Sequence, residues 1–471
     1  MTTLKASQRG LAKVKQTRKE KGWAVYDFRW LEEASLVLGI SWEEEGVLAS
    51  GISESTWKRF LAGKHPINAE AFKAYCQVLG LNWNEIVEGR DRKDWGKAPD
   101  VSIFYGRTSE LTTLEQWIVR DNCRLVEIFG MGGMGKTALA AKLAQRIQHE
   151  FEFIIWRSLL HAPPVEEILA ELIQFLCERQ ETDLPNNLDS QILRLLKYLR
   201  SHRCLLILDN AEAILQNGDS LGNHFTSCTG VYQNGYEGYG QLFKCVGETL
   251  HKSCLMLTSG EKLQGLAELE GETLPVRSLH LKGLPEAEGR NLFSAKGSFT
   301  GSDKEWRAVI SHYAGNPLAL KLVASAVRNY FGGSISCFLE FLNRDSFIFD
   351  DIRALLEQQF RRLSHLEQEV MSWLAINQEP MSFEELQRDL NSHLSSGQLL
   401  QILAALQRRS MIEFNADRFT QKPVIREYII TQLRSKVCQE IKEVKIEDLN
   451  QYFNLESTHL KRFTHSDLVK T

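Results

Sequence analysis

The sequence predicts an α/β domain with a parallel sheet, followed by an all-α lobe and a winged helix and preceded by an all-α domain. The main observation is that short apolar runs, typical of buried strands, alternate with segments of helical periodicity in residues 101–278. Such alternation favours a doubly wound sheet with helices on both faces. A second observation is that residues 279–440 have mostly helical patterns, with one hairpin pattern at residues 411–420. A third is that residues 1–88 contain capped helical segments.

Composition bounds the class of protein. The 471 residues suggest three or four domains, and 43 % hydrophobic with 25 % charged residues is typical of a soluble globular chain. A net charge of −4 gives no general affinity for polyanions. We expect no membrane span, because no apolar run approaches the roughly 20 residues that a bilayer requires. The first ten residues are polar and show no signal-peptide pattern, so we expect a cytoplasmic location. The nine scattered cysteines form no C-x-x-C pair, which favours free thiols over disulfides or zinc.

In the N-terminal region, the clearest element is a helix that Ser53 opens as N-cap and Gly63 ends. Residues 1–22 are strongly basic. The region resembles the helix-turn-helix of phage-repressor-type proteins, in which a short helix enters the major groove. The residues that match are Ser53, Glu54, Ser55, Thr56, Lys58, Arg59 and Lys64.

Two functions of this region stay open. In one, residues 51–64 bind DNA, with contacts from Thr56, Lys58 and Arg59 and with phosphates held by basic side chains. In the other, the region is a helical adaptor that binds a protein or the next domain. Residues 27–45 read as an insertion into the motif, and they end in the acidic run 43–45.

The whole chain is organised around Gly130-x-x-x-x-Gly135-Lys136-Thr137, the phosphate-binding P-loop pattern, set between a strand and a helix. Glycines let the backbone fold tightly enough for successive N–H groups to point at phosphate oxygens. Lys136 is expected to reach the β- and γ-phosphates, and the Thr137 hydroxyl is expected to bind Mg²⁺. The residues expected to hold the phosphates are Gly130, Gly132, Gly133, Gly135, Lys136, Thr137 and Ala138.

A second motif follows on a later strand. Residues 203–210 are an apolar run that ends in Asp209, which is the Walker B form and positions an acid for Mg²⁺. Residues 254–259 form another apolar run with polar residues at its end. Ligands bind at the carboxyl ends of parallel strands, and these polar residues all lie there.

Together the motifs resemble the NB-ARC module of STAND-class signalling NTPases over residues 100–440. Six motifs stand in the family's order: residues 104–110, Walker A at 130–137, Walker B at 206–209, a sensor strand at 257–259, Gly-x-Pro at 315–317 and the Met-His-Asp position at 421–427. The domains expected on this basis are a helical, helix-turn-helix-like domain at 1–88, a linker at 89–100, the P-loop nucleotide-binding domain at 101–278, the helical lobe at 279–350, the winged helix at 351–440 and a C-terminal helical tail at 441–471.

The resemblance implies bound ADP or ATP with Mg²⁺. Phe104 and Arg107 are implied to lie in the segment that contacts adenine and ribose, and Pro317 is implied to lie near the adenine. Lys422 stands where the family has a histidine on the β-phosphate, and a lysine can still pair with phosphate.

Two other positions depart from the family in ways that bear on hydrolysis. Asn210 replaces the acid that activates water, which leaves Glu212 as the nearest substitute, and Gly260 replaces the sensor arginine. The catalytic candidates are therefore Lys136, Asp209 and Glu212, with slow or absent ATP hydrolysis expected.

Three hypotheses of function remain. The chain is a nucleotide-dependent signalling switch whose lobes open and self-associate with ATP, a transcription regulator gated by nucleotide, or a catalytically dead scaffold that binds ADP. Family members carry a repeat sensor after the winged helix, so we expect either a longer protein or a separate sensor or effector partner.

Overall fold

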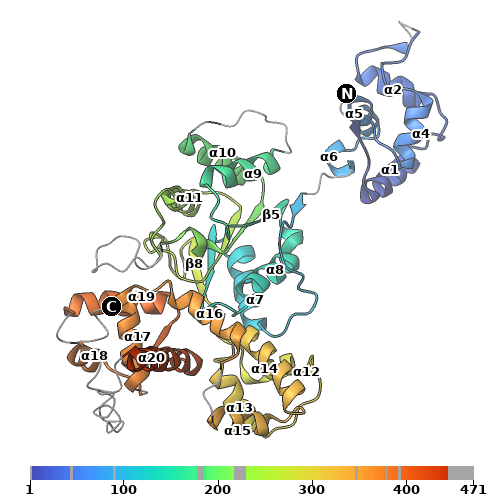
Figure 1. Ribbon diagram of the computed structural model, residues 1–471. Helices are drawn as coiled ribbons and strands as arrows, with labels where there is room; N and C mark the ends of the chain where they lie inside the picture. Colours follow the sequence, from blue (N-terminus) through green and yellow to red (C-terminus); the bar gives the residue numbers. More distant parts are fainter. Residues whose placement is uncertain are drawn as a thin grey trace. The chain divides into compact units, whose positions relative to one another are not determined.

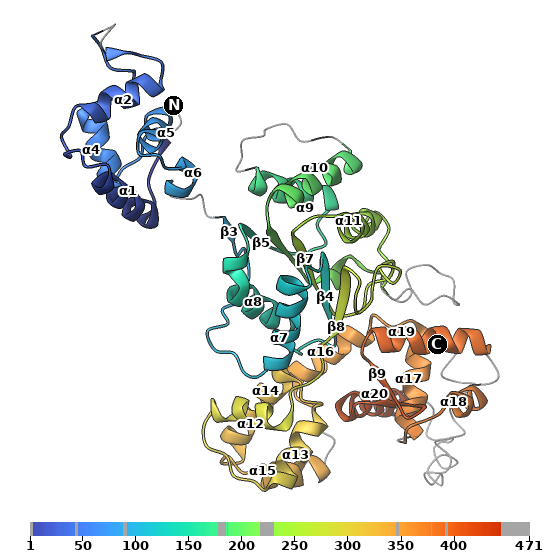
Figure 2. The same ribbon diagram turned by 180° about the vertical axis from the view of Figure 1, so that it is seen from behind.

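The computed structural model describes residues 3–42, 46–87, 92–177, 185, 187–216, 230–344, 348–377, 379–390 and 394–443. The chain forms two compact units, residues 1–92 and 93–471. Figures 1 and 2 show both from opposite sides. The predicted tail at 441–471 lies outside the described residues beyond residue 443.

The first unit is an all-α domain with one pair of two-residue strands. Its elements are β1 Thr3–Leu4, α1 Gln8–Glu20, α2 Arg29–Val37, α4 Glu54–Ala62, β2 Ile67–Asn68, α5 Ala69–Val78 and α6 Trp83–Ile86. Buried aromatic rings form its core, with Trp57 stacked on Trp30 and packed against Tyr75.

The ends of α4 follow the sequence signals. The Ser53 side chain accepts a hydrogen bond from the Thr56 amide, and Gly63 ends the helix in the left-handed region at φ 60°. Residues 38–53 separate α2 from α4. Because residues 43–45 of this stretch are not among the described residues, the described match to a helix-turn-helix consists of α4 and its cap.

The second unit is built on a six-stranded parallel sheet in the order β3-β5-β6-β7-β4-β8. The strands are β3 Lys93–Asp94, β4 Leu125–Phe129, β5 Phe153–Ser158, β6 Cys204–Asp209, β7 Cys254–Ser259 and β8 Val276–His280. Four of them match the predicted apolar runs. The two edge strands carry no such run: β3 lies in the segment expected to be a linker, and in β8 only Val276 is fully buried.

Helices cover both faces of this sheet (Figure 1). On one face lie α7 Thr108–Glu115, continued by η1 Gln116–Arg120, and α8 Lys136–Ile147; on the other lie α9 Val165–Leu176, α10 Leu188–Ser201 and α11 Glu237–Glu248. Side chains alternate along β4, because Leu125 belongs to the second face and Val126 to the first. Helix α11 includes the Gly-Tyr-rich residues 237–240.

Helices and a hairpin complete the second unit. The helical lobe contains α12 Glu286–Ser294, α13 Asp303–His312, α14 Pro317–Tyr330 and α15 Ile335–Arg344. The last part contains α16 Asp350–Phe360, α17 His365–Asn377, α18 Phe383–Asp389, α19 Ser396–Arg408, β9 Ile412–Asn415, β10 Arg418–Gln421 and α20 Pro423–Glu443. Ala416 and Asp417 join β9 to β10 with positive φ, as a tight hairpin turn requires. The predicted fold class is therefore confirmed.

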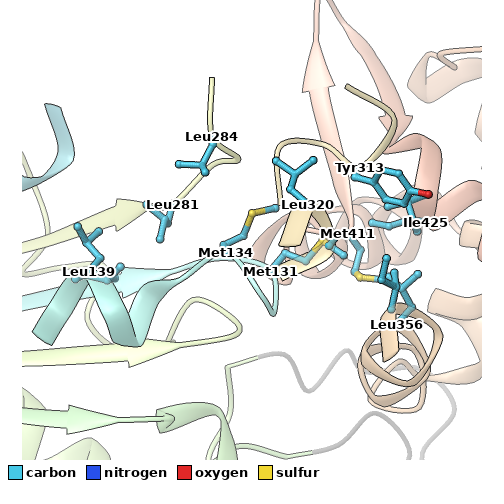
Figure 3. Packing of buried hydrophobic residues seen from close by; sticks show 14 of the residues in the cluster. Met131, Met134, Leu139, Leu281, Leu284, Tyr313, Leu320, Leu356, Met411 and Ile425 are labelled. Carbon is cyan, nitrogen blue, oxygen red and sulfur yellow. The ribbon is translucent and has the colours of Figure 1, made fainter. Parts of the chain in front are cut away.

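One hydrophobic cluster runs through all three parts of the second unit. It contains Met131 and Met134 of the P-loop together with Leu320 of α14, Leu356 of α16 and Met411 beside β9. Figure 3 shows these side chains converging from their separate elements. The loop that should bind phosphate is therefore packed into the core between the lobes. None of the described helices is long and apolar enough to cross a membrane.

Candidate nucleotide-binding site

The P-loop, residues 130–137, forms a cradle between β4 and α8. Gly130, Gly133 and Gly135 have φ of 151°, 78° and 86°, values that suit glycine. Gly135 is the N-cap of α8, where no side chain caps the helix. A Cβ added at Gly135 would have nothing within 4 Å, so open space lies beside the uncapped helix end. This arrangement fits a phosphate, which binds to free N–H groups at a helix N-terminus.

Lys136 points its ammonium group into this loop. Its Nζ donates to the carbonyl oxygens of Gly130 at 2.7 Å and Met131 at 3.1 Å. The side chain is buried, and desolvation lowers the pKa of the amine, while the charges of Glu212 and Asp209 oppose that shift. A buried cation of this kind is well placed for an anionic ligand.

Thr137 and Asp209 lie in contact where β6 ends. The Thr137 hydroxyl donates to Asp209 Oδ1 at 2.8 Å, and Thr258 on β7 donates to the same oxygen at 2.5 Å. Burial raises the pKa of Asp209, against the lowering effect of these two hydrogen bonds. One hydroxyl beside one carboxylate suits Mg²⁺, which takes few protein ligands and relies on phosphate oxygens and water for the rest. Among the described residues, no group of three or more His, Cys, Asp or Glu could hold a metal by itself.

Asn210 and Glu212, which follow Asp209, both take part in hydrogen bonds in which an amide is the donor. Asn210 donates from Nδ2 to Ser158 Oγ at 3.3 Å and to Asp209 Oδ2 at 3.2 Å. Glu212 accepts the amide of Gly260 on Oε2 at 2.9 Å. Its charge nevertheless contributes to the pKa of both Asp209 and Lys136. The fold thus brings the proposed substitute acid and the sensor position next to one another.

Arg107 joins the segment before α7 to the P-loop and the helical lobe. Its guanidinium donates to Glu110 at 2.7 Å and to the Met134 carbonyl at 3.2 Å, and its amide donates to Glu288 of α12 at 3.3 Å. The side chain is buried. Phe104 is half-buried, with the Lys142 ammonium 5.9 Å from its ring centre. Arg107 thus contacts the loop directly.

The Gly-x-Pro segment lies against the P-loop. Asn316 Nδ2 donates to the Gly132 carbonyl at 2.9 Å, and the Leu318 amide donates to the Gly133 carbonyl at 3.3 Å. Pro317 is the first residue of α14, with Asn316 as N-cap. A Cβ at Gly132 would meet Gln359 of α16 at 2.5 Å. The loop is therefore enclosed by two later parts of the chain, while Ala138 packs partly buried in α8.

Lys422 faces a different cavity. It is 9 % exposed, and its Nζ lies 3.8 Å from Glu413. The cavity, of about 370 Å³, is lined by Lys282, Gly283, Leu284, Glu286, Arg307, Ile310, Ser311, Ala314, Gly315, Glu413, Gln421, Lys422 and Pro423. No P-loop residue is among these lining residues. Lys422 is linked to the P-loop only indirectly. Its positive charge helps to lower the pKa of His280. The His280 ring stacks on Phe129, which directly precedes Gly130, with 4.9 Å between the ring centres.

Two contacts of the site were not predicted. Thr258 shares the Asp209 oxygen, and its signal in the sequence is the polar end of the apolar run at residues 254–259. Asn316 lies inside the recognised Gly-x-Pro motif, but at its variable position. The hydrogen bond of the Asn316 side chain to the P-loop becomes apparent only from the packing of α14 against that loop.

The sequence matches one protein-family model and is similar to known proteins. The model of the NB-ARC domain matches residues 107–254. An uncharacterized WD repeat-containing protein of Nostoc sp. is 56 % identical over 472 residues, covering 94 % of this chain. The disease resistance protein RPM1 of Arabidopsis thaliana is 29 % identical over 93 residues, which are 18 % of this chain and 10 % of that protein. This chain spans 37 % of the length of the Nostoc relative.

Two solved structures that match this chain come from species of Pyrococcus. A STAND protein with a tetratricopeptide repeat sensor from Pyrococcus horikoshii gives a TM-score of 0.37 at 19 % identity, over 80 % of this chain and 50 % of that one. A Walker-type ATPase of Pyrococcus abyssi gives a TM-score of 0.47 at 15 % identity, over 69 % of this chain and 96 % of that one.

Proposed function

The chain is a nucleotide-binding P-loop NTPase of the NB-ARC and STAND class, and from that premise we propose that it is a signalling switch controlled by ADP and ATP. ADP holds the P-loop domain, the helical lobe and the winged helix in one closed arrangement. Exchange for ATP releases the lobes and allows self-association. Lys136, Thr137 and the loop glycines hold the phosphates, and Thr137 with Asp209 holds Mg²⁺, which neutralises phosphate charge when bound.

The observation that carries this proposal is the contact between Asn316 and Gly132 at 2.9 Å. The loop that binds phosphate and the first turn of the helical lobe share a hydrogen bond, so a ligand that reshapes the loop must act on the lobe. A ligand that binds the closed form more tightly than the open form shifts the equilibrium toward closure. At a concentration about a hundredfold above the dissociation constant, such linkage stabilises the bound form by about 2.7 kcal/mol.

ATP hydrolysis is proposed to be slow. Asn210 carries an amide, which cannot act as the base that activates water. Glu212 is the remaining acid, and its Oε2 accepts the Gly260 amide at 2.9 Å. A carboxylate in this bond must be released before it can accept a proton from water. If that release never occurs, the chain is the ADP-bound scaffold of the third hypothesis.

The test is the nucleotide content and turnover of the purified chain. Heat-released nucleotide is separated by chromatography, and ATP turnover is measured with Lys136→Ala as the matched variant. Bound ADP with slow turnover that depends on Lys136 supports the switch, and bound ADP without turnover supports the scaffold. Absence of bound nucleotide, with no rise in melting temperature on adding ADP or ATP, would refute the proposal.

A second candidate function is nucleotide-gated DNA binding through residues 51–64. The observation that favours it is that Lys58, Arg59 and Lys64 are all exposed on or beside α4. Against it, Lys58 pairs with Glu54 on the same helix. Duplex binding that weakens with salt, and that is lost in Arg59→Ala, would support this function. If Arg59→Ala bound DNA as tightly as the wild type, DNA binding through residues 51–64 would be refuted, and a protein-binding adaptor would be favoured.

The partner that senses the signal is proposed to be a repeat domain. The Nostoc relative is named for WD repeats, and this chain aligns with only part of it. A WD-repeat module, in the same protein or a separate one, is therefore the sensor that we propose to test by co-purification.

A further inference from the structure

A cluster of three charged side chains, two of them buried, lies between the P-loop domain and the last part of the chain. Glu261 follows β7, and its side chain is 3 % exposed. Arg362 Nη2 donates to Glu261 Oε1 at 2.5 Å, and Arg409 Nε lies 3.4 Å from Glu261 Oε2. The Arg409 side chain is 5 % exposed. One carboxylate thus compensates two guanidinium groups, that of Arg409, which is buried, and that of Arg362, whose side chain is 22 % exposed.

The three residues come from three separate segments. Glu261 belongs to the sheet domain, Arg362 lies between α16 and α17, and Arg409 directly follows α19. Backbone contacts reinforce the junction, because the Lys262 amide donates to the Arg408 carbonyl at 3.1 Å. Arg409 Nη1 also donates to the Arg362 carbonyl at 2.7 Å. Separating the winged-helix region from the sheet domain would break the contacts of Glu261 and Lys262 with this region, while the bond between Arg409 and Arg362 lies within it.

The cluster also reaches the candidate nucleotide site. Arg362 Nη2 donates to the main-chain carbonyl of Glu212 at 3.0 Å. Glu212 lies in the short helix η3, Ala211–Ile214, directly after the Walker B strand. Its carboxylate in turn accepts the Gly260 amide, next to Glu261. A single guanidinium therefore contacts both turns that follow β6 and β7.

We propose that Arg362 is a positioning residue that holds Glu212 and the segment at Gly260 in the closed arrangement, so that the cluster with Glu261 and Arg409 restrains nucleotide release. This inference rests on the proposed switch. While Arg362 is in place, the turn that carries Glu212 cannot move without losing a partly buried hydrogen bond. When the winged-helix region moves away, that turn becomes free to rearrange.

The physical reason is the cost of an uncompensated buried charge. Removing the Glu261 charge leaves two guanidinium groups without their carboxylate, and removing Arg362 takes away one ion pair and the donor to the Glu212 carbonyl, so either change penalises the closed form. In the open form water solvates the same charged groups, so the loss of a partner carries no such free-energy cost there. Disrupting the cluster should therefore raise the open population and speed the loss of nucleotide.

The experiment measures release of a fluorescent ADP analogue from the full chain after dilution into excess ADP. For Arg362→Ala and for Glu261→Gln we expect release about tenfold faster than in the wild type, which corresponds to about 1.4 kcal/mol. Arg362→Lys keeps a charged donor and should release at close to the wild-type rate. The matched control is Arg361→Ala, because Arg361 is 77 % exposed and pairs with Glu357 on its own helix.

A second readout needs no nucleotide. Hydrogen exchange of peptides covering residues 209–216 should increase in Arg362→Ala and stay at the wild-type level in Arg361→Ala and Arg362→Lys. Peptides from β5 report global unfolding, and they should remain protected in every variant. A variant that loses protection everywhere has failed to fold, and Glu261→Gln then provides the test.

The outcomes separate this inference from the proposed function. If the wild type binds the analogue but Arg362→Ala and Glu261→Gln release it at the wild-type rate, with unchanged exchange at 209–216, the positioning role is overturned and the switch stands. If the wild type binds no analogue, the proposed function itself is refuted, and the exchange data alone decide whether the cluster restrains η3.

Discussion

Asn316 and Gly132, separated by 184 positions in the chain, are joined by a hydrogen bond of 2.9 Å from the side-chain amide to the backbone carbonyl. The same side chain accepts the amides of Leu318 at 3.0 Å and Ala319 at 3.3 Å through its Oδ1. Both ends of the amide group are therefore in use. Asn316 caps α14 and fixes the P-loop at once, so the helical lobe and the loop are coupled through one side chain.

Replacing Asn316 should separate these two roles. Asn316→Asp keeps the oxygen that caps α14 but loses the donor and places a carboxylate against a carbonyl oxygen. We expect it to release bound nucleotide faster while its melting temperature changes little. Asn316→Ala should in addition lose about 1 kcal/mol of unfolding free energy, a typical value for a lost N-cap. Equal release rates in wild type and Asn316→Asp would show that the contact with Gly132 does not couple the lobes.

Gly133→Ala should disturb the P-loop in two ways, because the added methyl group causes backbone strain at positive φ and also a steric clash with Asn316. Gly133 has φ of 78°, and its added Cβ would lie 2.7 Å from Asn316 Oδ1. Gly265, with φ of 86° and nothing within 4 Å of an added Cβ, is the matched control for strain alone. We expect Gly133→Ala to lose nucleotide affinity by titration calorimetry, while Gly265→Ala keeps it. Similar affinities in both variants would mean that the loop adapts.

Magnesium should lose its effect on nucleotide affinity when the Thr137 hydroxyl is removed. Thr137 and Asp209 are in contact at 2.8 Å, which places a hydroxyl and a carboxylate at one point. We expect EDTA to weaken ATP binding in the wild type and in Thr137→Ser, which keeps the hydroxyl, but to have little further effect in Thr137→Ala. If EDTA weakened ATP binding in Thr137→Ala as much as in the wild type, Thr137 and Asp209 would not be the residues that hold Mg²⁺.

Glu127 should make stability depend on pH. It lies on β4, between β7 and the edge strand β8, and burial raises its pKa from 4.5 to about 7, against hydrogen bonds from the Leu263 amide and the Ser278 hydroxyl. Because the folded pKa is the higher one, the stabilisation is fully present below pH 4.5 and is lost as pH rises through about 7. At 1.36 kcal/mol per unit, the loss is on the order of 3 kcal/mol.

Chemical unfolding from pH 5 to 8 tests this expectation. Glu127→Gln keeps the shape and can still accept the Leu263 amide, so its unfolding free energy should vary less with pH than that of the wild type. Glu268 is exposed, and Glu268→Gln should behave as the wild type does. Parallel pH profiles for Glu127→Gln and wild type would show that this carboxyl does not titrate in the folded chain across the range.

Much of the site could be predicted because its signals are local. The P-loop places Gly135, Lys136 and Thr137 in adjacent positions, so their spacing alone fixes how they present to phosphate. The strand that ends in Asp209 is buried on both faces, which makes it a continuous apolar run. Edge strands lack that signature. For this reason the sequence predicts a linker where β3 lies and gives no signal for β8.

Local sequence patterns are enough to predict the fold class, the phosphate-binding loop and the acid on β6, because each depends on residues that are neighbours in the chain. The distant side chains that complete the site become visible only once the chain is folded. The fold places Asn316 on Gly132, Thr258 on Asp209 and Arg362 on both Glu212 and Glu261, and it turns Lys422 toward Glu413 in a separate cavity. These contacts follow from how helices pack on the sheet, and packing depends on the shapes and volumes of many side chains at once, which no local pattern records.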